Sequence, residues 1–341
     1  MKLKKLSEQT IVITGATSGI GLATARMAAS CGAKLVLAAR SEKALRELTS
    51  EITGAGGQAV AVVADVGAED DVERISHKAI EHFGGFDTWV NNAGVSIYGK
   101  LMEVSIEDMR RLFETNFWGV VYGSLVAARH LRHMGGALVN VGSTLSDRAI
   151  PIQGMYSASK HAVKGFTDAL RMELEADGLP ISVSLIKPAT IDTPYTRHAR
   201  NYMESEPKNP SPAYSPKVVA EAILHCASNR TRDLFVGSGG KAISLLGHFA
   251  PRTMDKVMEK KMVKGQKSKK PSRTGEHQGL NAASGKLEER GDHEGHVSKT
   301  SFYTKATAHP LPTAALVVGA AAAATAAFLN KGPRSKRLKW R

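Results

Sequence analysis

A glycine-rich turn near the start of the chain restricts the fold more than any other feature. It follows a run of β-branched residues, 10–14, and precedes residues 20–30, whose pattern suits a helix. Gly15 and Gly19 permit a tight turn and let the backbone approach a pyrophosphate, whose charge then lies at the helix N-terminus. The order of strand, turn and helix predicts the first unit of a dinucleotide-binding fold, and a glycine turn without a ligand is the alternative.

The remainder of the first 250 residues repeats this alternation. The sequence predicts further strands at 34–39, 59–64, 88–90, 136–142, 181–186 and 233–237, separated by helical patterns that include one long helix over 105–133. The chain has 341 residues and 42% hydrophobic content, which is enough for a sizeable core. We therefore expect a single Rossmann-type α/β domain over residues 1–250: a doubly wound parallel sheet of about seven strands with helices on both faces.

Three polar side chains are predicted to converge on one ligand. Tyr156 and Lys160 are four residues apart, so a helix places them on the same face. A nearby ammonium favours the phenolate, so Lys160 is expected to lower the pKa of Tyr156. Ser143 follows the apolar run 137–141, which places its hydroxyl at the carboxyl end of a buried strand. Taken singly, each residue has an ordinary structural explanation, as a turn former, a half-buried aromatic or a solvated charge.

The glycine turn and these side chains together resemble the motif set of the short-chain dehydrogenase/reductase family, over about residues 6–240. The matching motifs are Thr14-Gly15-Ala16-Thr17-Ser18-Gly19-Ile20-Gly21, Asn91-Asn92-Ala93-Gly94, Asn116, Ser143, and Tyr156 with Lys160. The resemblance implies an enzyme that interconverts a carbonyl and an alcohol by hydride transfer with a nicotinamide cofactor. It also implies a catalytic tetrad of Asn116, Ser143, Tyr156 and Lys160, in which the Asn116 carbonyl holds a water molecule.

The resemblance also implies a set of cofactor-binding residues. In the family, an aspartate at the position of Asp65 holds the adenine, and a threonine at the position of Thr193 holds the nicotinamide carboxamide. Ala189 stands where the family usually has glycine, which is a mild departure. The cofactor-binding residues implied in this way are Thr14, Gly15, Thr17, Ser18, Gly19, Ile20, Gly21, Asp65, Val66, Asn92, Ala93, Gly94, Tyr156, Lys160, Pro188, Ile191 and Thr193.

The end of the second predicted strand bears on the choice between NADP(H) and NAD(H). Family members that use NAD commonly carry an acidic residue where Ala39 stands, and that residue would repel a 2′-phosphate. Arg40 and Ser41 follow, and an arginine fork with a hydroxyl suits a phosphate. We therefore expect NADP(H), with NAD(H) as the alternative if Arg40 is only a surface charge.

Residues 194–216 contain five prolines and are predicted to form a loop that resembles the family's variable substrate lid. The lid and residues 145–155 favour a moderately apolar small-molecule carbonyl or alcohol, without selecting one. The family resemblance further implies a homodimer or homotetramer. The two cysteines match no metal-site spacing, and the first apolar run is too short for a signal peptide. We therefore expect no metal and a cytoplasmic catalytic domain.

The positive charge of the chain is concentrated after the predicted domain. Of 46 basic and 32 acidic residues, 19 and 7 lie in residues 251–341, which leaves a net charge of only +2 for residues 1–250. We expect a helix over 242–262, an amphipathic helical extension at 251–264 that overlaps it, and then a disordered linker at 265–309. An Ala-rich apolar segment at 310–330 and a basic tail at 331–341 complete the chain.

The C-terminal segment leaves other functions open. Residues 311–329 are uncharged and just long enough to cross a bilayer, but the basic tail favours surface association of residues 311–341 with an anionic membrane. The alternatives to an enzyme are an NADP(H)-binding sensor that has kept the fold and a membrane-tethered scaffold whose tail is the working part. Nucleic-acid binding ranks last, because the charge is not interleaved with aromatic residues.

Overall fold

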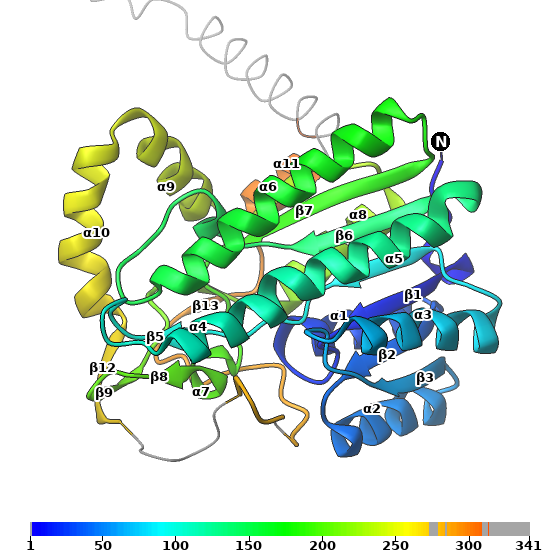
Figure 1. The fold of residues 1–341 in the computed structure, drawn as a ribbon, viewed down its shortest axis with the longest axis horizontal. Coiled ribbons are helices and arrows are strands. Elements are labelled where there is room, and N and C mark those ends of the chain that lie inside the picture. The colour runs from blue at the N-terminus through cyan, green and yellow to red at the C-terminus, as the bar shows by residue number, and fades with distance from the viewer. Residues whose placement is uncertain (1, 273–278, 284, 309–312, 314–341) are drawn as a thin grey trace, which may run out of the picture.

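The computed structural model describes residues 2–272, 279–283, 285–308 and 313. Its centre is a seven-stranded parallel sheet in the order β11-β7-β6-β4-β1-β2-β3 (Figure 1). The strands are β1 (Thr10–Thr14), β2 (Lys34–Ala39), β3 (Gln58–Val63), β4 (Thr88–Asn91), β6 (Gly136–Val141), β7 (Ile181–Pro188) and β11 (Asp233–Val236). The sheet order reverses between β1 and β4, where open α/β sheets bind their ligands. The predicted doubly wound parallel sheet is confirmed.

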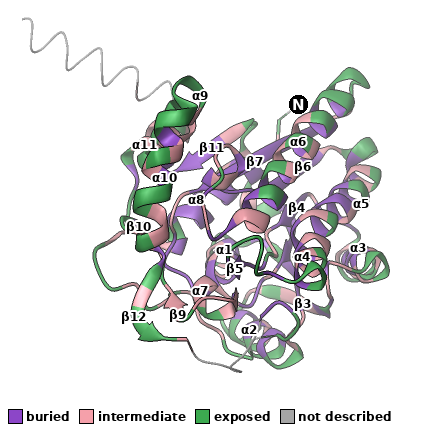
Figure 2. Cartoon of the chain, turned by 60° about the vertical axis from the view of Figure 1, so that its left-hand side comes forward, coloured by how far each residue is buried: buried purple, intermediate pink, exposed green. Residues whose placement is uncertain are grey.

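The side chains of the strands alternate between two cores. Ile11 and Ile13 of β1 pack on one face with α1 (Gly19–Ser30), α2 (Glu42–Gly54) and α8 (Pro216–Ser228). Val12, between them, points to the other face, which is covered by α3 (Glu69–Phe83), α5 (Gly119–Met134) and α6 (Gly154–Ala176). Figure 2 shows the buried strands between helices whose outer faces are exposed. Because both faces of the sheet are covered, the strand sequences are almost entirely apolar.

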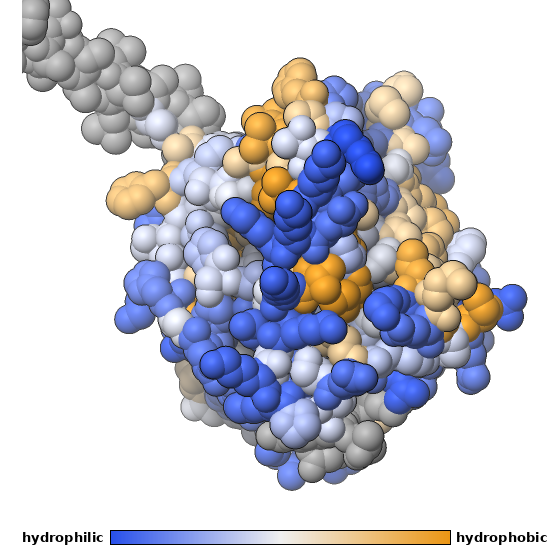
Figure 3. Space-filling model, turned by 90° about the vertical axis from the view of Figure 1, so that its left-hand side faces the viewer, coloured by the Kyte–Doolittle hydropathy of each residue, from blue (hydrophilic) through white to orange (hydrophobic). Residues whose placement is uncertain are grey.

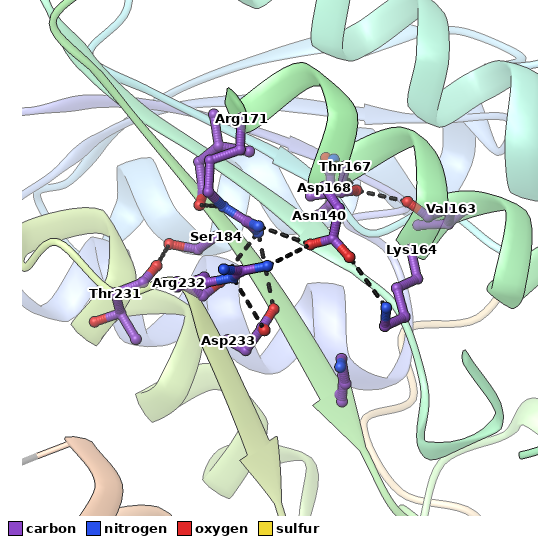
Figure 4. A network of polar contacts seen from close by, with 12 residues as sticks. Asn140, Val163, Lys164, Thr167, Asp168, Arg171, Ser184, Thr231, Arg232 and Asp233 are labelled. Atoms are coloured by element: carbon purple, nitrogen blue, oxygen red, sulfur yellow. Dashed lines mark hydrogen bonds and ion pairs between the residues drawn. The ribbon is translucent and has the colours of Figure 1, made fainter. Parts of the chain in front are cut away.

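A polar network fixes α6 against the edge of the sheet (Figure 4). The buried guanidinium of Arg171 donates to the Val183 carbonyl of β7 at 2.9 Å and to the Asp168 carboxylate at 2.7 Å. Burial alone would raise the pKa of Asp168, but hydrogen bonds from Arg171 and Lys164 lower it to about 2. The network therefore holds in place the helix on which Tyr156 lies.

The predicted long helix over 105–133 is not a uniform α-helix. α4 (Ile106–Phe113) is followed by a π-helical segment, Glu114–Trp118, and then by α5. Asn116 lies in the middle of this segment, and its side chain bonds to the main chain of Val95 instead of pointing to solvent. A single π-helical turn inside an α-helix is frequent at functional sites.

The elements after the last sheet strand differ from the expectations in two ways. Pro251 divides the helix predicted over 242–262 into α9 (Ser238–Phe249) and α10 (Pro251–Gly265), because proline cannot donate the hydrogen bond that a continuous helix needs. In the range 265–309, which was expected to be a disordered linker, the described residues include elements that contact the domain. The range contains β12 (Lys267–Pro271), β13 (Val297–Ser298) and α11 (Phe302–Ala308), and Leu280 is fully buried.

The loop 194–216 contains short elements that pair with other loops. These are α7 (Tyr195–His198), β8 (Arg200–Asn201), β9 (Ser205–Pro207) and β10 (Ala213–Tyr214), and β8 pairs with β5 (Ile97–Tyr98). β9 pairs with β12 and β10 with β13, so the C-terminal extension holds the loop from its far side. Among the described helices, none combines the length and the apolar content that a membrane span needs. The predicted segments 310–330 and 331–341 lie outside the described residues, apart from residue 313.

Candidate active site

A cavity of about 280 Å³ opens at the carboxyl ends of the central strands. Its polar wall combines residues that follow β4, β6 and β7 with two residues of α6. Leu145, Ile150, Ile243, Met258 and Met262 supply an apolar wall, so α9 and α10 contribute to the same cavity. The predicted site residues that line it are Ile20, Asn92, Gly94, Ser143, Tyr156, Lys160, Pro188, Ile191 and Thr193.

Ser143, Tyr156 and Lys160 converge as the sequence predicted. α6 begins at Gly154, so Tyr156 and Lys160 lie one turn apart, with the Lys160 ammonium 5.7 Å from the centre of the Tyr156 ring. The ammonium donates to the Val141 carbonyl at 2.8 Å, at the end of β6. The Tyr156 phenol hydrogen-bonds with Ser143 and with Tyr195. Two hydroxyl groups and one ammonium therefore surround one phenol at the wall of the cavity.

The protonation of this group differs from the expectation. Burial raises the pKa of the Tyr156 phenol, and the hydrogen bonds from Tyr195 and Ser143 oppose that rise without reversing it. Burial also lowers the pKa of Lys160 to about 8. The phenol pKa is therefore raised and not lowered as predicted, because desolvation disfavours the charged forms of both groups. In this state the phenol is a proton donor.

Asn116 lies beside this group but acts through its side chain. Its Oδ1 accepts from the Val95 amide at 2.8 Å, and its Nδ2 donates to the Val95 carbonyl at 2.9 Å and to the Ser159 hydroxyl at 3.2 Å. Asn116 is fully buried. The side chain thus fixes the chain just after Gly94 relative to α6, and the water-holding role of its carbonyl stays a prediction.

The glycine turn is packed against the end of β4. The Thr14 hydroxyl accepts from the amides of Asn92 and Ala93 at 3.0 and 3.1 Å, and the Asn92 side chain donates to the Thr14 carbonyl at 2.9 Å. Gly15 has φ +65°, and a Cβ on Gly21 would lie 2.1 Å from the Gly15 carbonyl oxygen. The turn therefore has the close backbone packing that a dinucleotide cradle requires, and the first turn of α1 fits a pyrophosphate.

The residues predicted for the adenosine end have protein partners. The Ser41 hydroxyl accepts from the Ala44 amide at 3.3 Å, so it caps α2. The Asp65 carboxylate forms an ion pair with Arg111 and accepts from the Gly67 amide at 3.0 Å. Val66 packs in the core beneath α5. None of these contacts tests the predicted cofactor roles.

Arg40 and the glycine turn contact a segment that sequence reasoning did not connect with the site. Arg40 donates to the carbonyls of Gly279, Leu280 and Ala282, and the Gly19 amide donates to the Glu288 carbonyl at 2.8 Å. Ser18 forms a β-bridge with Glu288, and Thr17 lies buried in the same turn. Nothing in the composition of this polar segment indicated the contact, because most of its hydrogen bonds go to main-chain carbonyls of the segment.

Tyr195 is a second residue missing from the predicted site. Its hydroxyl lies 2.7 Å from the Ser96 hydroxyl and accepts from the Gln153 side chain at 2.9 Å, and its hydrogen bond to Tyr156 lowers the pKa of that phenol. Its ring packs edge-on against that of Tyr156, with 5.5 Å between ring centres. Its place two residues after Thr193, at the start of the predicted lid, was the available signal.

Known proteins resemble the chain in sequence and structure. The sequence profile described as short chain dehydrogenase matches residues 9–204. An uncharacterized oxidoreductase, YxnA, of Bacillus subtilis is 51% identical over 329 residues, which cover 96% of this chain and 92% of that protein. That match therefore includes most of the C-terminal extension. 11-beta-hydroxysteroid dehydrogenase A of Sesamum indicum is 39% identical and covers 55% of this chain and 53% of its own length.

A solved structure gives the same result. A short chain dehydrogenase/reductase from Burkholderia phymatum, in complex with NAD, superposes with a TM-score of 0.66 at 27% identity, covering 80% of this chain and all of that one. An alcohol dehydrogenase from Thermococcus sibiricus, complexed with 5-hydroxy-NADP, has a TM-score of 0.59 at 28% identity and covers 67% of this chain and 95% of its own. With the profile match over more than half of its length, the chain belongs to the short-chain dehydrogenase/reductase family and is an oxidoreductase.

Proposed function

We propose that the protein interconverts a moderately apolar carbonyl compound and the corresponding alcohol, with NADP(H) as cofactor. The observation that supports this most directly is the convergence of Ser143, Tyr156 and Lys160 on one cavity, beside the glycine turn. A bound nicotinamide cofactor would supply the hydride to the carbonyl carbon, or accept it in the reverse direction. The chain's own residues supply the proton and hold the oxygen.

In the reducing direction, Tyr156 donates its phenolic proton to the carbonyl oxygen as that oxygen gains charge. Ser143, which hydrogen-bonds with the phenol, is placed to donate to the same oxygen. The Lys160 ammonium, held by the Val141 carbonyl, stabilises the phenolate that remains and would hold the nicotinamide ribose hydroxyls. The product alcohol leaves, and the phenol regains its proton from solvent by a relay that Asn116 would complete.

Substitution of Tyr156 by phenylalanine tests this mechanism. Tyr156→Phe removes the proton donor and keeps the ring, so turnover should fall by about 10²- to 10⁴-fold while cofactor affinity stays near that of the parent. The assay follows NADPH oxidation against a panel of apolar ketones and aldehydes. Parental turnover by Tyr156→Phe on a substrate that the parent reduces would refute the assignment. If the parent turns over nothing on broad carbonyl and alcohol panels yet binds cofactor, the sensor alternative gains support.

The preference for NADP(H) rests on the end of β2. No carboxylate follows the strand at Ala39, and the half-buried Arg40 guanidinium lies there near Arg111. An arginine at this place suits a 2′-phosphate. The test is a fluorescence titration with NADPH and with NADH. Arg40→Ala should remove most of the difference between the two dissociation constants, and NADH binding as tightly as NADPH in the parent would contradict the preference.

An anionic membrane surface is a further proposed partner. Figure 3 shows hydrophilic and hydrophobic side chains side by side on one face of the molecule. α10 exposes Arg252, Lys256 and Lys260, which are four residues apart, and α9 exposes Leu246 and Phe249. Basic and apolar side chains on one surface favour binding to anionic lipid. Sedimentation with vesicles that contain phosphatidylserine, compared with phosphatidylcholine vesicles, tests this proposal. The expected homodimer or homotetramer is tested separately, by the mass in solution.

A further inference from the structure

A segment of the C-terminal extension lies in the part of the cleft that the cofactor's phosphates and adenosine are expected to occupy. We call residues 279–283 and 285–293 the strap. In Figure 1 the strap belongs to the orange trace that passes between α7 and α1. We propose that the strap is an internal competitor of the nicotinamide dinucleotide, which must displace it in order to bind. This proposal rests on the proposed function of the cleft.

The strap uses the groups of the cleft that are suited to phosphate. The Glu288 carbonyl accepts the Gly19 amide at 2.8 Å, at the first residue of α1. The Arg40 fork is spread over three strap carbonyls, including that of Leu280 at 3.0 Å and that of Ala282 at 3.2 Å. The Gly19 N–H cannot bond fully to the Glu288 carbonyl and to a phosphate oxygen at once, and three of the five N–H donors of Arg40 are taken by strap carbonyls, so the strap and a dinucleotide compete for these groups.

The strap also contacts the loop that carries the predicted nicotinamide ligand. Arg290 pairs with the buried carboxylate of Asp192 at 2.8 Å, and the His293 amide donates to the same carboxylate at 3.4 Å. A Cβ on Gly291 would lie 2.4 Å from the Thr193 carbonyl oxygen, so the strap backbone touches this loop directly. The strap therefore spans the cleft from Arg40, past α1, to the loop after β7.

Leu280 anchors the strap. Its side chain is fully buried in a cluster with Val95, Ile97, Val104 and Leu112, against which Tyr156 also packs. Two further ion pairs, Arg197 with Glu288 and Arg26 with Glu289, join strap carboxylates to α7 and α1. These pairs are partly exposed and weak singly. Burial of Leu280 is therefore the main source of the strap's affinity for the cleft.

Competition of this kind weakens the apparent affinity for cofactor, because the intrinsic dissociation constant is divided by the fraction of molecules whose cleft is free. The test is a titration of the full chain with NADPH, followed by nicotinamide fluorescence, in the parent, Leu280→Asp and Leu280→Met. An aspartate disfavours the buried position, so Leu280→Asp should bind NADPH roughly tenfold to a hundredfold more tightly than the parent. Leu280→Met keeps an apolar side chain of similar volume and should bind NADPH as the parent does.

A second pair of variants guards against a folding defect in Leu280→Asp. Arg290→Ala removes the ion pair with Asp192 from the strap side, and Arg290→Lys keeps a cation there. Arg290→Ala should bind NADPH about threefold to tenfold more tightly than the parent, and Arg290→Lys should stay close to the parent. Unchanged or weaker binding by both Leu280→Asp and Arg290→Ala would overturn the competition.

Thiol labelling gives a readout that needs no turnover. The native Cys31 is exposed and Cys226 is buried, so the probe is Leu280→Cys in a Cys31→Ser background. Position 280 should react slowly with an alkylating reagent, and NADPH should accelerate the reaction with saturation at high concentration. A slower reaction with NADPH would show a strap that closes over bound cofactor, and this would also overturn the proposal.

The two proposals fail in different ways. If Leu280→Asp and Arg290→Ala bind NADPH with the dissociation constant of the parent, the strap does not compete and the proposed function stands. If neither the parent nor these variants binds NADPH or NADH, the proposed function and the competition both fall.

Discussion

Asn116→Ala should destabilise the whole domain, because the Asn116 side chain is a clamp on the main chain of Val95. The variant removes the acceptor of the Val95 amide, at 2.8 Å, and the donor to the Val95 carbonyl, at 2.9 Å. Both residues are buried, so water cannot replace either bond fully. Leaving a buried polar group without a partner costs about 1–3 kcal/mol, so two such groups cost roughly 2–5 kcal/mol. That is a large part of the roughly 5–15 kcal/mol that stabilises an ordinary domain.

The assay is urea denaturation followed by circular dichroism, in the absence of cofactor. The midpoint for Asn116→Ala should fall with little change in slope, because the native structure is destabilised without being expanded. Ser159→Ala is the matched control, since it removes only the third bond of the Asn116 amide, at 3.2 Å, and should cost about 0.5–1.5 kcal/mol. A loss of less than about 1 kcal/mol for Asn116→Ala would refute the clamp and favour a role through the main-chain carbonyl alone.

Three other perturbations test the site and its support. The pKa of Lys160 in the folded chain is about 8, below its value in the unfolded chain. Above pH 8 the unfolded chain therefore binds more protons than the folded chain, and stability should rise with pH from 8 to about 10. Urea midpoints measured at each pH should show this rise in the parent and not in Lys160→Met. Tyr195→Phe removes a hydrogen bond that lowers the pKa of Tyr156. The limb of the pH–rate profile that reports this phenol should therefore move to higher pH. The dissociation constant of NADPH should stay unchanged. Arg171→Met should lower the free energy of unfolding in urea by about 2–3 kcal/mol, because the Val183 carbonyl loses its buried donor. Loss of the exposed Arg232 side chain should lower it by less than about 0.5 kcal/mol.

The features that could be predicted from the sequence are those set by local pattern. Most strands of the sheet have an uninterrupted apolar run, and the four-residue spacing of Tyr156 and Lys160 needs only a helix to bring them together. Ser143 was located by the end of the strand before it. These predictions succeeded because neighbours along the chain decide them, and the parallel sheet then collects the strand ends at one edge.

The features that could not be predicted depend on partners distant in the sequence. The side chain of Asn116, in the π-helical segment, bonds to Val95, which lies 21 residues before it. The raised pKa of Tyr156 follows from burial, which its spacing to a lysine does not reveal. The role of Ser41 as a cofactor ligand stays a prediction, but its position as the N-cap of α2 gives its hydroxyl a partner in the helix itself, which the prediction did not include.

The strap packs into the cleft although its composition predicts disorder. Its polar, charged sequence has too few apolar residues to form a core, and that observation predicts disorder for an isolated segment. A segment next to an existing cleft needs fewer apolar residues to become ordered. One leucine can be buried in the domain, and several main-chain carbonyls can bond to donors that the domain already presents. These donors are the first amide of α1 and the guanidinium of Arg40. Apart from the strap they are left available for the phosphates of a dinucleotide. The groups that suit the cleft to a cofactor therefore also let it bind its own chain, and the two occupants must compete.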